Sequence, residues 1–387
     1  MKILMIAPHP FMTYRGSPLN VFNKLKVLDD MGYAITLLTY PEGENIDLPN
    51  VTIKRVPLIP LLKNIPVGVS IHKIAYDALL LLYGIYLTSR EEYKVIHAHE
   101  IDGAFIGAIL KLIKRKNVIL FYDMHSLIFE LIDTDSLIGN ALNWLSKIIE
   151  KFLYGISDKL LIISPAFSER ISKFGQSEKI VFLPDTAPIE EVIIDKYLTN
   201  ELNSKFGDKK ILLYTGNLEK YQGIDLLIEA FKKVEKIRKD AVLLIVGGRE
   251  DQVKKYKNKI ENMGLKNVYF IKQKPMEKIP TYLEFSYAVL SPRLSGSNIP
   301  FKIYPYLKHG KAIIATNIPS HNLILKDGEN ALLCNVSSAD LAQKILNLLE
   351  DVKLKKKLEL GAKKLYEENF NKEIYIKKLR SVYEYDL

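Results

Sequence analysis

The sequence predicts an α/β protein with two doubly wound, Rossmann-like domains, and three observations lead to this fold class. Short β-branched or leucine-rich runs alternate with stretches of helical periodicity, which is the pattern of parallel sheets covered by helices on both faces. Six such runs come first, an interruption follows, and six more runs complete the pattern. A chain of 387 residues, 48% of them hydrophobic, is long enough to bury a core in each half.

The first predicted strand lies at the amino terminus, where the apolar run is too short for a signal peptide. The strands expected in the first half are 2–7, 34–39, 95–98, 118–122, 159–163 and 179–182, and those in the second half are 210–214, 241–246, 268–271, 287–290, 312–315 and 331–334. The expected helices include 17–31, 74–88, 142–155, 223–237, 303–308, 338–349 and 366–385. Helix 74–88 is apolar but shorter than the roughly 20 residues of a membrane span, so we expect a buried helix.

The interruption between the two sets of strands marks the domain boundary. Residues 184–208 contain two prolines and several acids and show no clear periodicity, so we place a hinge there. We therefore predict four parts: an amino-terminal Rossmann-like domain (1–185), a linker (186–208), a carboxyl-terminal Rossmann-like domain (209–368) and a final helix (369–387) that packs back on the first domain.

Cysteine content and charge limit the class of partners. Cys334 is the single cysteine, which excludes a disulfide framework and a multi-cysteine zinc site and suits the reducing cytoplasm. The formal net charge is +10, but the lysines are scattered, and no basic stripe with interleaved aromatic residues indicates nucleic acid binding. Phosphorylated sugar donors and anionic membrane surfaces are both compatible with this charge.

The first candidate site follows the first predicted strand, because ligands of doubly wound sheets bind beyond the carboxyl ends of the strands. Arg15, Gly16 and Ser17 stand there, with Ser17 as the expected N-cap of a helix whose free N–H groups can bind an anion or a hydroxyl. An ordinary strand–helix loop has the same pattern, but Arg15 beside Gly16 favours an acceptor-side role. The full glycine-rich dinucleotide fingerprint is absent, so no nicotinamide cofactor is expected.

Histidines follow two further strands of the first half. His97 and His99 suggest a metal site, but they share one face only if the strand continues through both, and no further ligand set is evident. We therefore expect no metal. His125 comes immediately after a strand, with Asp123 and Ser126 nearby for hydrogen bonding, and is our catalytic candidate in this half.

The second half begins with a strand that runs into a turn containing two glycines. Gly216 and Asn217 open this turn, Lys220 follows, and Gly223 precedes a predicted helix. Phosphate oxygens can approach backbone N–H groups in such a turn. We therefore predict that Gly216, Asn217 and Lys220 bind the donor.

A later loop carries two cations around a second turn. Arg293 directly follows a strand, and Lys302 precedes the short predicted helix 303–308. Between them, Gly296, Ser297 and Asn298 supply further hydrogen-bond donors. A polar surface loop is the simpler interpretation, but cations at both ends of a glycine turn favour binding of a diphosphate.

At these residues the sequence resembles the retaining family 4 glycosyltransferases, which have the GT-B fold of two Rossmann-like domains facing a central cleft. The segments that carry the resemblance are 15–17, 95–99, 122–125, 216–225, 291–293, 302–304 and 310–316. They span nearly the whole chain. The resemblance implies that Tyr304 also binds the donor and that the reaction needs neither a metal nor another cofactor.

The sequence departs from this family at four positions. Two glutamates that family members usually carry eight positions apart fall on Ser297 and Pro305, and the usual early arginine and lysine fall on Asn217 and Gln222. The resemblance therefore implies a divergent subgroup without the paired glutamates, in which the late loop neutralises the phosphates.

The resemblance implies transfer of a sugar, with retention, from a nucleoside diphosphate donor to an acceptor hydroxyl. Departure of the diphosphate requires preorganised positive charge and N–H dipoles, which we expect from Arg293, Lys302 and the two glycine turns. His125 would contact the transferred sugar. Two alternatives stay open: a sugar-nucleotide epimerase or hydrolase on the same fold, and a non-catalytic protein that binds nucleotides or sugars.

The acceptor side is less defined by the sequence. We expect a glycan or a lipid-linked acceptor, because the apolar stretch 58–69, helix 74–88 and the basic segment 111–116 permit a peripheral membrane contact. The expected location is the cytoplasm, with contact to the inner membrane face.

Overall fold

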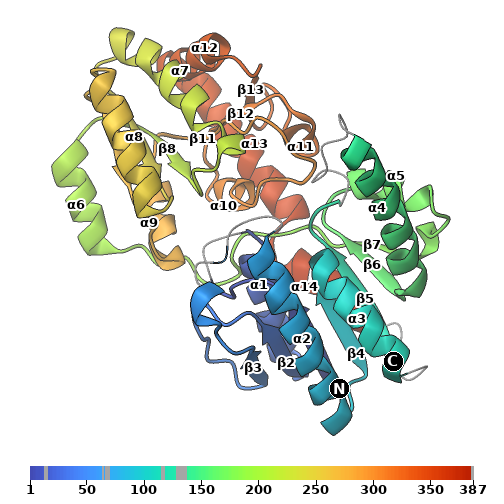
Figure 1. Ribbon diagram of the computed structural model, residues 1–387. Helices are drawn as coiled ribbons and strands as arrows, with labels where there is room; N and C mark the ends of the chain where they lie inside the picture. Colours follow the sequence, from blue (N-terminus) through green and yellow to red (C-terminus); the bar gives the residue numbers. More distant parts are fainter. Residues whose placement is uncertain (13–15, 63–64, 66–69, 115–117, 128–136, 385–387) are drawn as a thin grey trace. The chain divides into compact units, whose positions relative to one another are not determined.

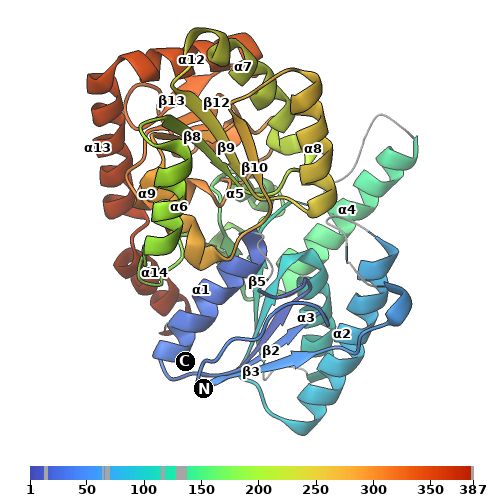
Figure 2. The same cartoon turned by 90° about the vertical axis from the view of Figure 1, so that its left-hand side faces the viewer.

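The computed structural model describes residues 1–387 apart from 13–15, 63–64, 66–69, 115–117, 128–136 and 385–387, and apart from the side chains of 137–142. The chain forms two compact units. The first contains the opening strand, Ser17–Pro184 and the residues from Ile376 onward, and the second contains Asp185–Tyr375. Each unit is a parallel sheet with helices on both faces, which confirms the predicted fold class (Figures 1 and 2).

The sheet of the first unit has seven parallel strands in the order β3-β2-β1-β4-β5-β6-β7. They are β1 (Lys2–Ala7), β2 (Ala34–Thr39), β3 (Val51–Arg55), β4 (Val95–His99), β5 (Ile119–Met124), β6 (Lys159–Ile162) and β7 (Ile180–Phe182). The strand order reverses between β1 and β4, which pair from Ile3 with Val95 to Ile6 with Ala98. Such a reversal leaves a crevice at the carboxyl ends of the strands.

Helices cover both faces of this sheet. They are α1 (Gly16–Asp30), α2 (Ile71–Arg90), α3 (Glu100–Lys114), α4 (Leu137–Ile156), α5 (Ala166–Ser172) and the later part of α14 (Lys372–Glu384), with short 3₁₀ turns η1 (Pro60–Leu62) and η4 (Ser177–Lys179). Alternate strand residues point to opposite faces. Leu4 and Ile96 therefore join the apolar core that also contains residues of α2 and α3. His97 and Asp123 point to the other face, where they contact α14 and α1.

The sheet of the second unit has six parallel strands in the order β10-β9-β8-β11-β12-β13. They are β8 (Lys210–Thr215), β9 (Ala241–Val246), β10 (Val268–Ile271), β11 (Ala288–Ser291), β12 (Ile313–Thr316) and β13 (Leu332–Cys334). Its helices are α6 (Lys196–Phe206), α7 (Ile224–Ile237), α8 (Glu250–Asn262), α9 (Ile279–Phe285), α10 (Ile303–Lys308), α11 (Pro319–Asn322), α12 (Ser338–Glu350) and α13 (Val352–Asn369), with 3₁₀ turns η5 (Lys220–Gln222) and η6 (Met276–Lys278). The strand order reverses between β8 and β11.

Three elements differ from the sequence predictions, whereas every predicted strand is found to within two residues. The edge strand β3 was not predicted, because none of its residues is fully buried and its apolar signal is weak. Helix α6 lies within the predicted linker, and it buries only Leu202 and Phe206, too few positions to give a clear period. The predicted final helix 366–385 is two helices, with a break between Asn369 and Lys372.

The helix predicted to be buried over 74–88 is α2, and the prediction was wrong for its outer side. Tyr76, Leu80 and Leu87 are buried, but the side chains of Ile74 and Leu82 are 63% and 64% exposed. One side of α2 packs on the sheet, and nothing in the described chain covers the other. Among the described residues, no helix combines the length and the apolar character needed to cross a membrane.

Candidate functional site

The candidate site of the second unit lies where the strand order reverses. Strands β8 and β11 are neighbours in the sheet, and residues 216–223 and 292–302 follow their carboxyl ends. The two loops are joined by a backbone hydrogen bond of 2.8 Å from the Leu294 amide to the Tyr221 carbonyl. Gly223 permits this approach: it has φ +73°, and a Cβ there would lie 1.9 Å from the Pro292 carbonyl oxygen. The crevice of the sheet thus brings both predicted donor-binding turns together.

Lys302 reaches from the start of α10 to the early turn. Its Nζ donates to Gln222 Oε1 at 2.8 Å, lies 3.8 Å from the centre of the Tyr214 ring, and is 3.0 Å from the place of a Cβ on Gly216. Burial, with a smaller contribution from the charge of Arg293, holds the pKa of Lys302 well below its ordinary value. Among the described residues no carboxylate forms an ion pair with this ammonium group. The site therefore favours an incoming anion.

Arg293 shapes the late loop. Its Nε donates to the Ser295 carbonyl at 2.7 Å, and its two terminal nitrogens donate to the backbone and side-chain oxygens of Asn298, each at 3.1 Å. The guanidinium group also lies 5.3 Å from the centre of the Tyr221 ring, within range of a cation–π contact. A Cβ on Gly296 would lie 2.2 Å from Arg293 Nη2, so the loop requires glycine at this position.

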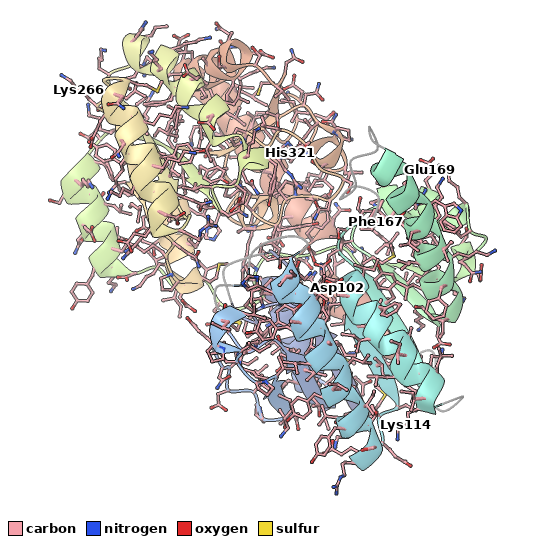
Figure 3. All side chains as sticks on the ribbon, viewed as in Figure 1. Asp102, Lys114, Phe167, Glu169, Lys266 and His321 are labelled. Atoms are coloured by element: carbon pink, nitrogen blue, oxygen red, sulfur yellow. The ribbon has the colours of Figure 1, made fainter. Side chains whose placement is uncertain are left out.

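A buried histidine fixes the base of this loop. His321 is fully buried, and burial lowers its pKa to about 4, so the ring is neutral at physiological pH (Figure 3). Its Nδ1 donates to the Thr316 carbonyl at 2.7 Å, which leaves Nε2 to accept from the Ser291 hydroxyl at 2.9 Å. The Thr316 hydroxyl in turn donates to the carbonyl of Arg293. This chain of hydrogen bonds holds the ends of β11 and β12 together directly below the loop.

The other predicted donor-binding residues of the second unit lie in several different elements. Asn217 lies in the early turn, where its carbonyl accepts from the Tyr214 hydroxyl at 2.6 Å, and Ser297 lies in the late loop. Lys220 is exposed on η5. Tyr304 is buried in α10, with its ring 5.3 Å from that of Phe370, so it belongs to the apolar core.

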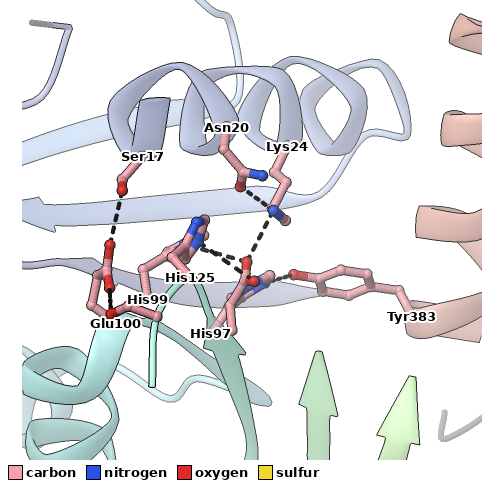
Figure 4. A network of polar contacts seen from close by, with 10 residues as sticks. Ser17, Asn20, Lys24, His97, His99, Glu100, His125 and Tyr383 are labelled. Atoms are coloured by element: carbon pink, nitrogen blue, oxygen red, sulfur yellow. Dashed lines mark hydrogen bonds and ion pairs between the residues drawn. The ribbon is translucent and has the colours of Figure 1, made fainter. Parts of the chain in front are cut away.

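The first unit contains a second polar cluster, at the carboxyl ends of β4 and β5 (Figure 4). Asp123 Oδ2 lies 3.0 Å from Lys24 Nζ, 3.0 Å from His97 Nε2 and 3.1 Å from His99 Nδ1. All four side chains are fully buried. Burial alone would raise the pKa of Asp123, but Lys24 and the neighbouring histidines outweigh it and hold the pKa well below its ordinary value. The pKa values of His97 and His99, which also contact Asp123, are lowered, chiefly by burial.

His125, the catalytic candidate, is part of this cluster and is only 5% exposed. Its Nε2 lies 3.3 Å from His99 Nδ1 and 3.5 Å from Asp123 Oδ1. Burial works against protonation, but the carboxylates of Asp123 and Glu100 outweigh it and raise the pKa of His125. Of the three histidines in the cluster, His125 is therefore the one most easily protonated.

The acceptor-side candidates lie at the start of α1. Ser17 donates to Glu100 Oε1 at 2.8 Å, and Ser126 donates to Glu100 Oε2 at 3.4 Å, so Glu100 joins α1 to the loop after β5. Glu100 has φ +59°, an uncommon conformation for a side-chain-bearing residue. Gly16 is the first residue of α1, and Arg15 lies outside the described residues.

His97, His99 and Asp123 each offer one ligand atom, and these atoms lie within 4.8 Å of one another. The carboxylate oxygen that faces both rings already binds the ammonium group of Lys24, and His97 Nδ1 contacts the Tyr383 hydroxyl. The ammonium group of Lys24 therefore supplies positive charge at the carboxylate oxygen that a metal ion would have to bind.

Sequence analysis did not find Lys24, Tyr221 or His321. Lys24 and His321 lie within predicted helical or loop segments and carry no local signal, because their partners are distant in sequence. Tyr221 follows Lys220 in the early turn. Its aromatic side chain beside a glycine turn was the signal that could have identified it as a site residue.

Comparisons with known proteins identify sequence relatives of this chain. The model of the family Glycosyl transferases group 1 matches residues 199–365, which lie within the second unit. An uncharacterized glycosyltransferase of Methanocaldococcus jannaschii is 25% identical over 389 residues, covering 99% of this chain and 98% of the relative. These matches identify a glycosyl transferases group 1 domain in the second unit.

Solved structures show the same fold at low identity. Sucrose-phosphate synthase of Thermosynechococcus elongatus superposes with a TM-score of 0.80 at 17% identity, covering 99% of this chain and 98% of the other. HepE of Anabaena, in a complex with UDP and glucose, has a TM-score of 0.76 at 17% identity and the same coverage. The chain therefore has the two-domain GT-B fold.

Proposed function

We propose that this chain, with its GT-B fold and its glycosyl transferases group 1 domain, is a retaining hexosyltransferase that moves a sugar from a nucleoside diphosphate donor to an acceptor hydroxyl. The observation that carries the proposal is the position of Lys302: a desolvated ammonium group beside the early glycine turn, close to a second cation and without a carboxylate partner in the described chain.

This arrangement supports a diphosphate site for a physical reason. A buried cation is costly unless an opposite charge compensates it. The resembled family usually has a lysine at the position of Gln222. In this chain the ammonium group of Lys302, from the late loop, lies beside Gln222 and supplies the positive charge there. In glycosyl transfer the diphosphate leaves with negative charge, and preorganised cations and N–H dipoles lower the barrier to its departure.

The proposed donor is a UDP-sugar. HepE, which shares the fold, has been solved with UDP and glucose. The positions where the resembled family carries its paired glutamates are Ser297 and Pro305 here, so the ribose hydroxyls would be bound by other groups. Asn298 and the backbone of residues 296–298 are the candidates, because they line the loop that Arg293 orders.

The proposed acceptor is a glycan or a lipid-linked molecule, and the proposed location is the cytoplasm with peripheral contact to its membrane. The apolar residues exposed on α2 support the contact, because one side of this helix is not covered by the described chain.

Isothermal titration calorimetry with UDP, GDP and their glucose conjugates tests the donor proposal. We expect binding of UDP and UDP-glucose to the wild type and at least about tenfold weaker binding to Arg293→Ala, since hydrogen bonds to charged groups contribute about 1.5–3 kcal/mol. Arg238→Ala is the matched control, because Arg238 pairs with Asp240, which precedes the amino end of β9 and so lies at the opposite end of the sheet. Absence of binding for every nucleotide would contradict the proposal.

The reaction itself is tested with UDP-glucose in the presence and absence of candidate acceptors. A transferase releases UDP only when an acceptor is present, and NMR of the product should show the anomeric configuration of the donor. Conversion or cleavage of the donor without an acceptor would instead identify an epimerase or a hydrolase, and an inverted product would exclude retention.

His125 is proposed as a catalytic residue of the first unit. The carboxylates of Asp123 and Glu100 raise the pKa of His125, which favours the protonated imidazole. In His125→Ala we expect turnover to fall about a hundredfold or more while UDP affinity stays within about twofold of the wild type. His72→Ala, at a half-buried histidine of α2, is the control. An unchanged turnover would assign His125 a purely structural role.

A further inference from the structure

The outer side of three helices in the first unit carries a large share of the exposed apolar side chains of the described chain. Their exposed fractions range from 40% for Phe152 to 75% for Ile71. These residues, which we call the apolar helix face, are Ile71, Ile74, Leu82 and Tyr86 on α2, Phe105, Leu112 and Ile113 on α3, and Trp144, Leu145, Ile148 and Phe152 on α4. Monomeric soluble proteins rarely expose contiguous apolar surface on this scale without an interaction partner.

The three helices lie side by side within one unit. Helix α3 packs against both α2 and α4, and Figures 1 and 2 show the three helices in one layer on the same face of the sheet. On α4 the exposed apolar residues recur at helical spacing, at 144, 145, 148 and 152, and so form one stripe along the helix.

The charges on these helices are segregated. Each carboxylate has a partner inside the first unit: Asp77 accepts from Tyr40, Asp102 from Lys73, and Glu100 from Ser17. Glu150 is 1% exposed and accepts from Arg170 Nε at 2.9 Å.

Lys73 and Lys111 of the same helices pair with Asp102 and Asp158, but two lysines of α4 are exposed. Lys147 and Lys151 lie on exposed turns of α4, next to the apolar stripe, and Lys114 is at the end of α3 (Figure 3). The apolar helix face is therefore bordered by positive charge, whereas the negative charges of its helices are turned inward or paired.

We propose that the apolar helix face docks the first unit onto the surface of an anionic lipid bilayer, with α4 lying in the plane of the interface. A helix that lies in a membrane interface has apolar and aromatic side chains on one face and lysines along the border of that face. Each lysine near an anionic surface adds about 1 kcal/mol of attraction, or roughly a fivefold change in partitioning. This inference extends the peripheral contact proposed above by assigning it to particular residues, and it does not depend on the donor chemistry.

A second copy of the chain fits this face less well. In a two-fold interface the same patch meets itself, so the lysines of one copy would approach those of the other. An anionic bilayer attracts the same charges that would repel a second copy.

Trp144 gives a direct test, because it is the single tryptophan of the chain and is 65% exposed on α4. We expect its fluorescence emission to shift to shorter wavelength when vesicles containing phosphatidylglycerol are added to the full-length protein. Vesicles of phosphatidylcholine alone should give a smaller shift. No shift with either vesicle would overturn the assignment of α4, and a shift that depends on protein concentration without vesicles would instead identify a second copy as the partner.

Co-sedimentation of variants with the same vesicles tests the face as a whole. Lys147→Glu/Lys151→Glu should lower binding at least about tenfold, whereas Lys353→Glu/Lys357→Glu should have little effect, although that pair has the same spacing on an exposed helix of the second unit. Ile148→Gln/Phe152→Gln should also reduce binding, with Val352→Gln/Leu360→Gln as its control. Equal loss in test and control variants would overturn the proposal.

UDP titration of each variant separates this inference from the proposed function. A variant that loses vesicle binding but keeps the wild-type UDP affinity supports the docking face, whatever the outcome for transfer. Loss of UDP affinity together with vesicle binding would mean that the substitutions disturb the fold rather than the face.

Discussion

Both units place a polar cluster at the carboxyl ends of their strands, but the charges of the two clusters are compensated differently. In the first unit Lys24 lies 3.0 Å from Asp123, and His97, His99 and His125 also contact this carboxylate. In the second unit Lys302 is half-buried beside Gln222 and near Arg293, with no carboxylate partner in the described residues. The first cluster contains its own counter-charge, and the second lacks one.

This difference indicates which cluster serves stability and which serves binding. A buried ion pair becomes strongly destabilising when one partner is removed, because the other charge is left uncompensated. A buried cation without a counter-ion already carries that cost in the free protein, and an anionic ligand removes it. We therefore expect loss of either partner of the Lys24–Asp123 pair to change mainly stability, and substitutions in the second cluster to change mainly binding.

The largest effect is expected from Asp123→Ala, which leaves the buried Lys24 without a counter-charge. We expect the free energy of unfolding to fall by about 3–5 kcal/mol, measured by urea denaturation. Glu91→Gln is the control in the same unit: it breaks the pair with Lys2, whose side chains are 40% and 42% exposed, and should cost less than about 1 kcal/mol. Equal losses in the two variants would mean that the first cluster is not a stability element.

The next largest effect is expected from Lys302→Met, which keeps the length of the side chain and removes its charge. UDP affinity should fall about 10- to 100-fold, since hydrogen bonds to charged groups contribute about 1.5–3 kcal/mol. The free energy of unfolding should stay the same or increase, because a desolvated cation is removed. Calorimetry and urea denaturation on the same samples measure both. A large loss of stability with unchanged affinity would reverse the comparison.

The pH dependence of UDP binding should be smaller, at most about tenfold per pH unit. The pKa of Lys302 is below its ordinary value in the free protein, and a bound diphosphate should raise it. Binding therefore takes up a proton, and affinity should increase as pH falls from about 9 to 7, below the ordinary lysine pKa of about 10.4. Calorimetry in buffers of different ionisation enthalpy measures the uptake, which should disappear in Lys302→Met. Proton release on binding would contradict the assignment.

The smallest effect is expected from Lys220→Met. Lys220 was predicted to bind the donor, but its side chain is exposed on η5. An exposed cation close to a phosphate is screened by water and salt, so UDP affinity should fall by less than about fivefold. A loss as large as that of Lys302→Met, measured in the same titration, would show that both lysines hold the diphosphate.

The sequence was sufficient for the strands and for the positions of the two donor turns. Arg293 and Lys302 could be found because each stands next to a strand end or a helix start, which the local pattern reveals. The edge strand β3 and helix α6 could not, since each buries few residues and neither has a strong period. Tyr304 shows the limit of transfer by resemblance, because its ring lies in the apolar core.

By itself the sequence determined the α/β class and the two sheets, because strands buried on both faces need continuous apolar runs that are visible without any partner. Only the tertiary structure decided which polar groups meet. Lys302 and Gln222 are 80 positions apart, and Lys24 and Asp123 come from a helix and a strand that the chain brings together only on folding. Compensation of charge depends on distances of a few ångströms between such groups, and sequence spacing does not contain those distances.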